Sequence, residues 1–346
     1  MTKTSPNSIK LPHQQADLFR AALEYTQSTT GFRASLIEKD YYCSLILQYI
    51  FARQDHDLMF KGGTCLNKVH LGFFRLSEDL DFTIPTDNDT SRTWRRRAIE
   101  PVKQLVGQIA AECPYFQVSI PLTGANNSTQ YNAEITYQSA LSSDLGRIKI
   151  EVGLREGLLL PADQGTATTL LKDPFSDATV VPGVTVRTLS LLEALAEKAR
   201  AMLTRREVAI RDFFDFWHAQ KTGALIVNTE FLYLVRKKLA VAPSQPLSFK
   251  PDQIEVLETQ VETDLRPVLN ETSFAAFSLQ DALDGAAALI EKLAVRIDAE
   301  VGGIKCIGLN KVGYPGNLVA ISVEGNRGAG WSLLGEWPEP IGGSSA

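Results

Sequence analysis

The sequence predicts an α+β protein in which a mixed half, built from strands and helices, precedes an all-helical half. Short apolar segments bounded by turn residues recur up to residue 152, whereas apolar residues recur at helical spacing from Leu189 onward. Between them, residues 155–187 are rich in Pro, Gly and Thr and predict a mostly looped join. The 346 residues are enough for two separate cores.

The first half is expected to begin with two helices, from Gln15 to about Tyr25 and from Leu36 to about Ala52, because apolar side chains recur there at helical spacing. A helix is also expected at Thr64–Leu71, and another at 93–112, which Pro101 kinks or divides. Five short strands complete this half: Leu58–Phe60, Leu80–Ile84, Phe116–Ile120, Tyr131–Tyr137 and Arg147–Val152.

The second half is expected to contain helices at 189–222, 228–240, 251–270 and 278–298. The last 46 residues hold eleven of the 24 glycines and no clear period, which predicts a flexible tail with one hairpin around Leu318–Val323. The expected division is an N-terminal helical extension (1–35), a core (36–155), a linker (156–188), a helical domain (189–300) and the Gly-rich tail (301–346).

Composition excludes several classes of protein. With 44% hydrophobic and 22% charged residues, the chain is not expected to be wholly disordered. The four cysteines are too widely spaced for a disulfide scaffold or a zinc motif. No apolar run approaches the about 18 residues of a membrane span, and the N-terminus lacks a signal-peptide core. We therefore expect a cytoplasmic protein with no membrane partner.

Charge is distributed unevenly along the chain. The net charge of −5 argues against a protein that coats nucleic acid broadly. Residues 91–103 nevertheless contain five basic side chains against one acid, Glu100: Arg92, Arg95, Arg96, Arg97 and Lys103. This stretch is either a patch that contacts phosphates or an ordinary solvated helix face. Arg205 and Arg206 are a second candidate for contacts with RNA phosphates.

Gly62-Gly63-Thr64 lies between an expected strand and an expected helix. Two glycines allow a tight turn and let a ligand approach the backbone without a Cβ in the way. The start of the following helix offers unpaired N–H groups, which suit a phosphate. The same tripeptide also occurs as a plain turn between a strand and a helix, so the motif alone leaves both interpretations open.

Asp79-Leu80-Asp81 places two carboxylates on one face of an expected strand, because side chains two apart in a strand share a face. Two neighbouring like charges repel unless a cation lies between them, and Mg²⁺ is bound in this way by one or two carboxylates together with substrate phosphates. If strand 147–152 pairs with strand 80–84, Glu151 is a third candidate ligand. Arg147 and Lys149 on the same face also allow a solvated strand edge.

Lys198 lies within an amphipathic helix, and Asp212 follows fourteen residues later in an aromatic segment. One straight helix would separate them by about 21 Å at about 1.5 Å per residue. A break at Thr204-Arg205-Arg206-Glu207 would let the chain fold back and bring the two side chains together. Such a pair is either part of a functional site or a salt bridge that joins two helices.

Jointly, these motifs resemble the AbiEii/AbiGii family of toxin nucleotidyltransferases, to which MenT-type toxins belong. The resemblance covers residues 36 to about 220 and rests on Lys-Gly-Gly-Thr, Arg-x-Ser-x-Asp-x-Asp, a carboxylate on a later strand, Glu-Lys in a helix and Arg-Asp-x-x-Asp, in that order. Glu38-Lys39-Asp40-Tyr41-Tyr42 before an aliphatic helix is also similar to the family.

The resemblance implies a DNA polymerase beta-like nucleotidyltransferase core with a mixed sheet, followed by a helical domain. It implies that Gly62, Gly63 and Thr64 cradle a nucleoside triphosphate. Asp79 and Asp81 would hold Mg²⁺, with Glu151 as the third ligand. The remaining implied residues are Lys198 on the nucleotide phosphates, Asp212 as the downstream aspartate, and Lys68, Arg75 and Ser77, which contact phosphate or brace the loop.

The implied activity is Mg²⁺-dependent addition of nucleotides to an RNA acceptor, the 3′ end of tRNA, which blocks translation, with a cognate antitoxin as a partner. The same core also suits a small-molecule or protein hydroxyl as acceptor. A non-catalytic RNA- or protein-binding module on this scaffold is the third alternative. The presence of Asp79, Asp81, Lys198 and Asp212 argues against the third alternative.

Overall fold

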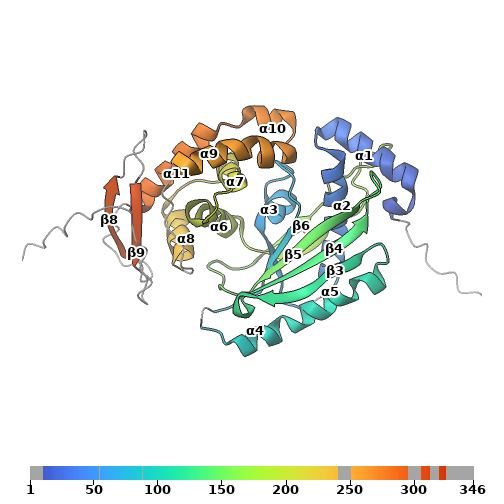
Figure 1. The fold of residues 1–346 in the computed structure, drawn as a ribbon, viewed down its shortest axis with the longest axis horizontal. Coiled ribbons are helices and arrows are strands. Elements are labelled where there is room, and N and C mark those ends of the chain that lie inside the picture. The colour runs from blue at the N-terminus through green and yellow to red at the C-terminus, as the bar shows by residue number, and fades with distance from the viewer. Residues whose placement is uncertain are drawn as a thin grey trace, which may run out of the picture. The chain divides into compact units, whose positions relative to one another are not determined.

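The computed structural model describes residues 11–53, 55–87, 89–240, 251–294, 305–311 and 319–324 (Figure 1). The chain forms two compact units. Unit 1 comprises Met1–Leu158, Ala162–Leu189 and Val268–Ser273, and unit 2 comprises Leu159–Pro161, Ser190–Pro267 and Phe274–Ala346. Unit 1 contains a mixed sheet and unit 2 is mainly helical, so the expected α+β class is confirmed.

Unit 1 is organised around a seven-stranded sheet in the order β3-β4-β5-β2-β1-β7-β6. The β2–β5 and β1–β7 pairs are parallel, and the other neighbours are antiparallel. The strands are β1 (Met59–Lys61), β2 (Leu80–Thr83), β3 (Gln117–Ala125), β4 (Gln130–Gln138), β5 (Leu145–Gly153), β6 (Asp163–Ala167) and β7 (Val184–Thr188). The five strands expected from the sequence are all present.

The core of unit 1 lies where alternating side chains of the sheet meet the helices. On β2, Leu80 and Phe82 are buried, and on β5 Ile148, Ile150 and Val152 are buried, as period-two alternation requires. Helix α2 (Ala34–Phe51) is buried along most of its length because its aliphatic and aromatic residues occupy nearly every face. Helix α1 (Ala16–Thr30) contacts α2 through its apolar side.

Residues 156–188, expected to be a linker, contain β6 and β7, and both strands belong to the sheet of unit 1. The expectation of a mostly looped segment is therefore wrong for these ten residues. Local pattern could not reveal them, because β7 is short and its parallel partner is remote: Thr188 pairs with Phe60. Val186 and Thr188 are fully buried by this pairing.

The expected helix at 93–112 is divided in two, as Pro101 indicated. Helix α4 (Arg92–Ala98) ends at Ile99, and α5 (Glu100–Glu112) begins with Pro101 in its first turn, where its missing N–H costs nothing. Helix α5 runs beside β3 in Figure 1 and buries its apolar stripe. Helix α4 instead has one buried residue, Arg95, and is otherwise largely exposed.

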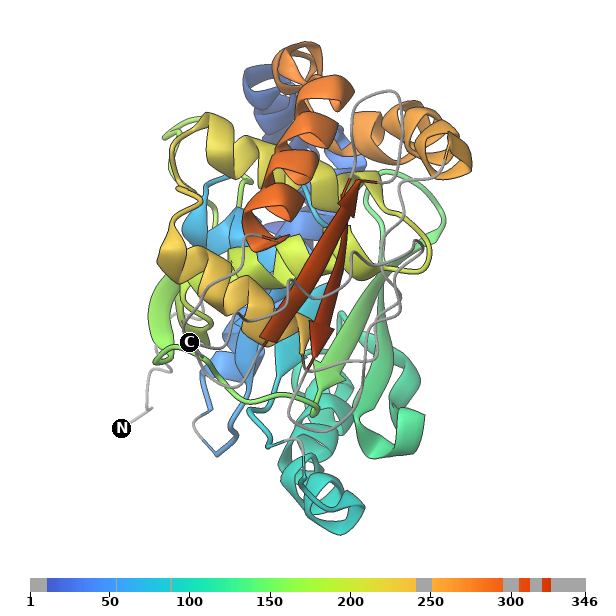
Figure 2. The same ribbon diagram turned by 90° about the vertical axis from the view of Figure 1, so that its left-hand side faces the viewer.

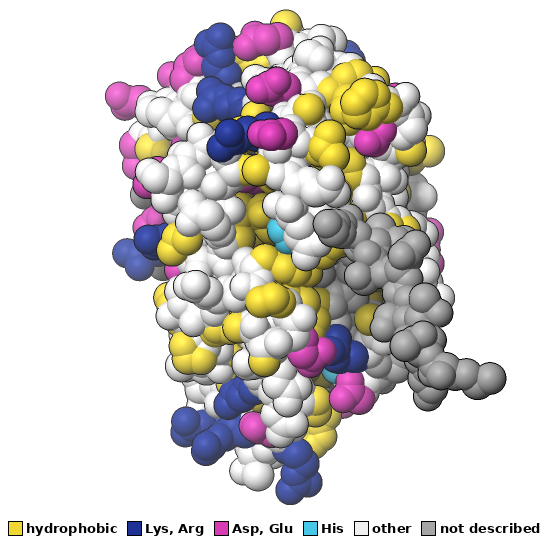
Figure 3. All heavy atoms as spheres, turned by 90° about the vertical axis from the view of Figure 1, so that its right-hand side faces the viewer, with side chains coloured by type: hydrophobic (Ala, Val, Ile, Leu, Met, Phe, Trp, Pro, Cys, Tyr) yellow, Lys and Arg dark blue, Asp and Glu magenta, His cyan; other side chains and the backbone are white. Residues whose placement is uncertain are grey.

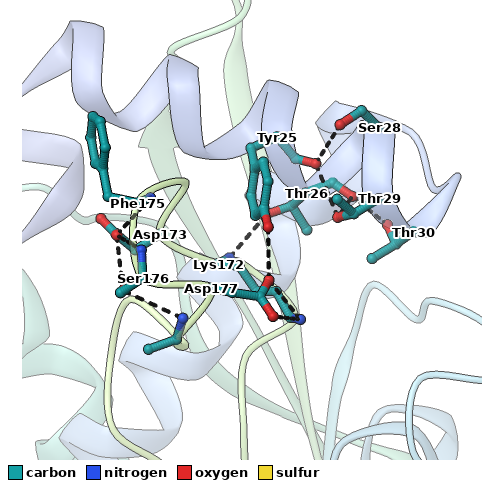
Figure 4. Close-up of polar contacts among 11 residues, drawn as sticks. Tyr25, Thr26, Ser28, Thr29, Thr30, Lys172, Asp173, Phe175, Ser176 and Asp177 are labelled. Atoms are coloured by element: carbon teal, nitrogen blue, oxygen red, sulfur yellow. Dashed lines mark hydrogen bonds and ion pairs between the residues drawn. The ribbon is translucent and has the colours of Figure 1, made fainter.

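A loop between Lys172 and Thr179 is tied to α1 (Figure 4). The Tyr25 hydroxyl donates to Asp177 at 3.0 Å, and the Lys172 ammonium group binds both oxygens of that carboxylate at 3.0 Å. The Lys172 backbone N–H also donates to the Thr26 hydroxyl at 2.9 Å. Phe175, at the tip of this loop, is 86% exposed and contributes nothing to the core.

A distant segment, Val268–Ser273, returns to unit 1. The carbonyl of Val268 accepts a hydrogen bond from the Leu76 N–H at 2.8 Å. The side chain of Asn270 donates to the Thr30 carbonyl at 3.2 Å. These two bonds tie the segment before β2 and the end of α1 to residues 192 and 240 positions later in the chain, 268 less 76 and 270 less 30.

Unit 2 contains the helices expected after Leu189. They are α6 (Leu191–Thr204), α7 (Ile210–Lys221), α8 (Thr229–Leu239), α9 (Pro251–Gln260) and α11 (Leu279–Ala294), with α10 (Glu271–Ala276) divided between the units. Strands β8 (Lys305–Lys311) and β9 (Val319–Glu324) form an antiparallel pair, drawn in red in Figure 2, at the position of the expected hairpin. The rest of the expected tail lies outside the described residues.

Two buried carboxylates and a lysine anchor α6 within unit 2. Lys238 on α8 is 1% exposed and lies 2.7 Å from Glu193 and 3.0 Å from Glu197. Glu193 also accepts the backbone N–H groups of Leu159 and Leu160.

Across the described residues of both units, no helix has the length and apolar character that a bilayer span requires.

Candidate functional site

The glycine turn follows β1 directly and carries the chain into α3 (Gly62–Cys65) and a π-helical turn, Leu66–His70. Gly62 has a φ of +76°, which only glycine adopts without strain. A Cβ at position 62 would collide with the Asp81 carboxylate, and one at 63 would lie 2.5 Å from the Arg75 guanidinium. The space that the two glycines leave is therefore filled by the chain's own Asp81 and Arg75.

The segment from Arg75 to Asp81 folds over this turn. The Thr64 hydroxyl donates to the backbone carbonyl of Asp79, and a Cβ at position 63 would lie 3.1 Å from the Ser77 hydroxyl. The guanidinium of Arg75 is 2% exposed and donates to the Leu76 carbonyl at 3.0 Å. Unit 1 thus gathers Gly62, Gly63, Thr64, Arg75, Ser77, Asp79 and Asp81 in one place.

The carboxylates lie on the accessible face of β2. Asp79 is exposed and Asp81 is half-buried, whereas Leu80 between them is fully buried, so the two acids share a face as expected. The expected pairing of the two strands is confirmed: β5 runs parallel to β2, and Asp81 is directly opposite Glu151. On the other side, Asp81 is opposite Lys61 of β1, which places one cation beside two carboxylates.

Carboxylate oxygens are the ligands that Mg²⁺ prefers, and Mg²⁺ commonly takes only one or two of them, completing its shell with phosphate oxygens and water. The pair Asp79 and Asp81 fits that donor set. Within the described residues, no three His, Cys, Asp or Glu side chains are clustered as a preformed metal site. The role of Glu151 as a third ligand therefore stays a prediction, supported by its register opposite Asp81.

Lys68 is directed into the interior of unit 1. Its side chain is fully buried, and the ammonium group lies 2.5 Å from the Asp40 carboxylate and 2.7 Å from the Ser44 hydroxyl. It also donates to the Thr168 carbonyl at 3.1 Å. Asp40 in turn accepts the Leu170 N–H at 2.8 Å. Of the two roles implied for Lys68, these contacts favour bracing over phosphate binding.

In unit 2, α6 ends at Thr204 and α7 begins at Ile210, so the expected break is present. The chain folds back there and brings the Lys198 ammonium to 2.9 Å from Asp212 Oδ1. The same ammonium lies 2.9 Å from Asp215 Oδ2, and Arg205 lies 3.3 Å from Asp212 Oδ2. Two cations and two anions thus form one ion-pair cluster.

Burial within this cluster is uneven. The side chains of Asp212 and Asp215 are 3% and 0% exposed, while that of Lys198 is 15% exposed. Sequence reasoning did not assign Asp215 or Arg205 to the cluster. The signal was available for Asp215, because residues three apart in a helix share a face. Arg205 lies in the break between the helices, where no periodicity indicates the direction of a side chain.

The residues of the Glu38-Lys39-Asp40 motif each hold a different segment of unit 1. Glu38 accepts the Ser139 hydroxyl and the Ala140 N–H, at 2.7 and 2.6 Å. Lys39 pairs with Glu78 at 3.0 Å, directly before Asp79. Together with the Asp40–Lys68 pair, these contacts of the motif therefore support the site.

Two cysteines near the site are not activated. Burial raises the pKa of the Cys43 thiol and of the Cys65 thiol to about 12, so both are protonated at neutral pH. The Cys65 sulfur lies 2.9 Å from the Thr188 hydroxyl of β7. These two groups therefore pack within the sheet and do not act as thiolate nucleophiles.

Similarity to known proteins is found with a family model and with solved structures. A family model described as "Nucleotidyl transferase AbiEii toxin, Type IV TA system" matches residues 45–285. Among solved structures, MenT4, a nucleotidyltransferase toxin from Mycobacterium tuberculosis, is 18% identical with a TM-score of 0.47, over 80% of this chain and 98% of that one. JHP933 from Helicobacter pylori is 17% identical with a TM-score of 0.42, over 74% of this chain and 94% of that one.

A search of curated proteins gives no significant match. The family match is independent of the structural similarities, and it spans both the glycine turn with its carboxylates in unit 1 and the Lys198 cluster in unit 2. It covers more than half of the 346 residues. The chain therefore belongs to the AbiEii family of nucleotidyltransferase toxins of type IV toxin–antitoxin systems.

Proposed function

We propose that this nucleotidyltransferase toxin transfers a nucleotide from a nucleoside triphosphate to the 3′ hydroxyl of an RNA acceptor, namely the 3′ end of tRNA, and thereby blocks translation. The observation that carries the proposal is the assembly of Asp79 and Asp81 on the Gly62-Gly63 turn, in a chain of this family. The new bond joins the acceptor oxygen to the α-phosphate, and the bond to pyrophosphate breaks.

Unit 1 supplies the carboxylate side of this reaction. Asp79 and Asp81 would hold Mg²⁺, which when bound lowers the negative charge of the phosphates and polarises the phosphate under attack. Arg75 and Ser77, packed on the glycine turn, keep that turn close to the carboxylates. Lys61, opposite Asp81, limits the repulsion between Asp81 and Glu151 before the substrate binds.

Lys198, in the ion-pair cluster of unit 2, is the second part of the proposal. We assign to Lys198 the contact with the leaving phosphates, because a lysine ammonium is a compact charge suited to phosphate. Asp212 and Asp215 are both ion-paired and buried, so we propose that they orient the Lys198 side chain. Asp215 is the more deeply buried of the two and fixes the ammonium from one side, while Asp212 shares its charge with Arg205.

The test is incubation of the full chain with each labelled nucleoside triphosphate and total cellular RNA. We expect label in RNA of tRNA size, loss of transfer when EDTA removes divalent cations, and recovery with added Mg²⁺. Asp81→Asn keeps the shape of the side chain but removes its charge, and should lower the rate by at least about a hundredfold, as loss of a key electrostatic group does.

Circular dichroism of Asp81→Asn is the control for folding. Label found only in protein or in a small product would show that RNA is not the acceptor. A folded wild-type chain that transfers no nucleotide to any acceptor, with Mg²⁺ present, would contradict the proposal as a whole.

A further inference from the structure

Helix α4 carries the densest positive charge in unit 1. Its seven residues include four arginines and no acid, although the whole chain has a net charge of −5. The side chains of Arg92, Arg96 and Arg97 are exposed. An exposed cluster of arginines of this kind complements a polyanion. On the face drawn in Figure 3, other Lys and Arg side chains (dark blue) lie at both the upper and the lower end.

The fourth arginine of α4, Arg95, is 8% exposed. Its buried Nε has no hydrogen-bond partner. A buried donor without an acceptor is unfavourable, because the hydration that it loses is not replaced. An anion bound against α4 would relieve that cost.

Helix α4 lies beside the turn that joins β3 to β4. Asn126, Asn127 and Ser128 have φ values of +48°, +56° and +65°, so three consecutive non-glycine residues occupy the left-handed region. Arg92 Nε donates to the Ser128 hydroxyl at 3.5 Å. Backbone strain of this kind is typical of functional segments, and here it positions a polar turn directly against the arginines of α4.

The same turn connects α4 to the carboxylate face of the sheet. Thr129, which follows it, accepts the Leu154 N–H at 2.8 Å, just beyond the end of β5. Glu151 lies three residues earlier on β5, about 10 Å away at about 3.3 Å per residue, and is opposite Asp81. Within unit 1, the turn that Arg92 contacts is therefore joined to the strand that carries Glu151.

The side chain of Trp94 indicates which form of polyanion, single-stranded or duplex, suits this surface. It is 44% exposed in the middle of the exposed arginines, and an exposed indole is an apolar face that a base can cover. Bases inside a duplex are already stacked, so an indole of this kind favours unpaired nucleotides. The arginines provide planar groups that match phosphate oxygens.

We propose that α4 and the Asn126–Ser128 turn form a docking ridge for single-stranded RNA close to its 3′ end. Trp94 stacks on a base, and Arg92, Arg96 and Arg97 contact the flanking phosphates. The inference rests on the proposed function, because it assigns the place where that RNA acceptor is held. The ridge binds the acceptor strand, and the carboxylates of β2 act on its end.

The test measures binding of a fluorescent single-stranded RNA to full-length Asp81→Asn protein, in which transfer is blocked. Trp94→Ala should weaken binding by about tenfold, the typical loss of one stacked base. Arg96→Ala with Arg97→Ala should reduce the slope of log affinity against log salt by about 1.4, because each phosphate contact on a single strand contributes about 0.7. A blunt duplex should not lose affinity on removal of Trp94.

Two matched substitutions serve as controls in the same unit. Phe175→Ala removes an aromatic side chain that is 86% exposed on the loop of Figure 4. Arg147→Ala removes an arginine whose side chain is 72% exposed. Both should bind RNA as the parent does, so that a general loss of surface charge or aromatic area is separated from the effect of α4.

A crosslinking experiment uses only the wild-type protein, so its result does not depend on whether any variant folds. Wild-type protein irradiated with 4-thiouridine RNA should give crosslinks in peptides that contain residues 91–98 or 126–128. Crosslinks only elsewhere, or unchanged binding by the folded Trp94 and Arg96/Arg97 variants, would overturn the docking ridge. Binding of an acidic protein in place of RNA would overturn it as well.

A failure of the docking ridge can also be distinguished from a failure of the proposed function. If wild-type protein labels no RNA but loses RNA binding with the α4 variants, the transfer proposal fails and the ridge stands. If wild-type protein labels RNA and the α4 variants bind and label it equally well, the ridge alone is wrong.

Discussion

Gly62 is the residue on which the geometry of unit 1 depends most directly. It has a left-handed backbone, and the Asp81 carboxylate fills the space where a side chain would begin. From the sequence, the two glycines suit either a turn that a ligand approaches closely or a plain turn between a strand and a helix. In the structure this space is taken by a residue of the site, so the turn and the carboxylate must move together.

Gly62→Ala is therefore expected to lose activity and to destabilise unit 1. The left-handed φ alone costs about 1–2 kcal/mol, and the collision displaces Asp81 in addition. Gly72→Ala is the matched control, because Gly72 has a φ of +69° with nothing within 4 Å of its Cβ. Urea unfolding and nucleotide transfer measure both effects. Equal transfer by the two variants would show that Asp81 tolerates the shift.

At the scale of elements, the Asp40–Lys68 ion pair joins α2 to the π-helical turn after the glycine turn. Both side chains are almost fully buried. Lys68→Met should therefore lower the free energy of unfolding by about 3–5 kcal/mol, because it leaves Asp40 buried without a counter-charge.

The double variant Asp40→Asn with Lys68→Met should recover much of that stability and, with it, nucleotide binding. Thermal unfolding and calorimetric titration with a nucleoside triphosphate are the measurements. Recovered stability without recovered nucleotide binding would assign Lys68 to the phosphates and contradict the bracing role.

The elements also show what the sequence could reveal. The break between α6 and α7 and the pairing of Lys198 with Asp212 were predictable, because amphipathic periodicity ends where charged residues interrupt it. The pairing of strand 147–152 with strand 80–84 was considered only as a condition, and the structure shows β5 parallel to β2 with Asp81 opposite Glu151. These predictions depended on periodicity or alternation within single segments of the chain.

What the sequence missed depends on partners far apart in the chain. Strands β6 and β7 were absent from the prediction because Thr188 pairs with Phe60, a contact that no local period encodes. Buried ion pairs such as Lys238 with Glu193 are hidden for the same reason, since charged residues are expected on the surface. The assignment of metal and phosphate roles in the site stays a prediction.

For the molecule as a whole, three half-buried histidines contribute to the response to acid. Burial lowers the pKa of His13 to about 4, and it also lowers the pKa values of His70 in unit 1 and His218 in unit 2. A lowered folded pKa gives stability that is complete above the unfolded value of 6.5 and is lost as pH falls toward the folded value. Glu38 acts in the opposite direction, because burial raises its pKa.

We therefore expect the urea midpoint to fall as the pH is lowered from 6.5 to 4, the range over which the His13 contribution is lost. His13→Asn, which does not titrate, should have a shallower fall over the same range. The Tyr41 hydroxyl, 2.8 Å from His13 Nδ1, keeps a polar neighbour in this variant. A midpoint that is constant down to pH 4 in the wild-type chain would contradict the assignment.

The hydrogen bond from Leu76 to Val268 has a consequence for biosynthesis. Leu76 stands between Arg75 and Ser77, yet its partner leaves the ribosome only after another 192 residues, 268 less 76, have been added. A nascent chain, or a fragment cut before Val268, lacks one of the bonds that secure the segment next to the glycine turn. For a toxin, this order of assembly delays that bond until residue 268 has been added.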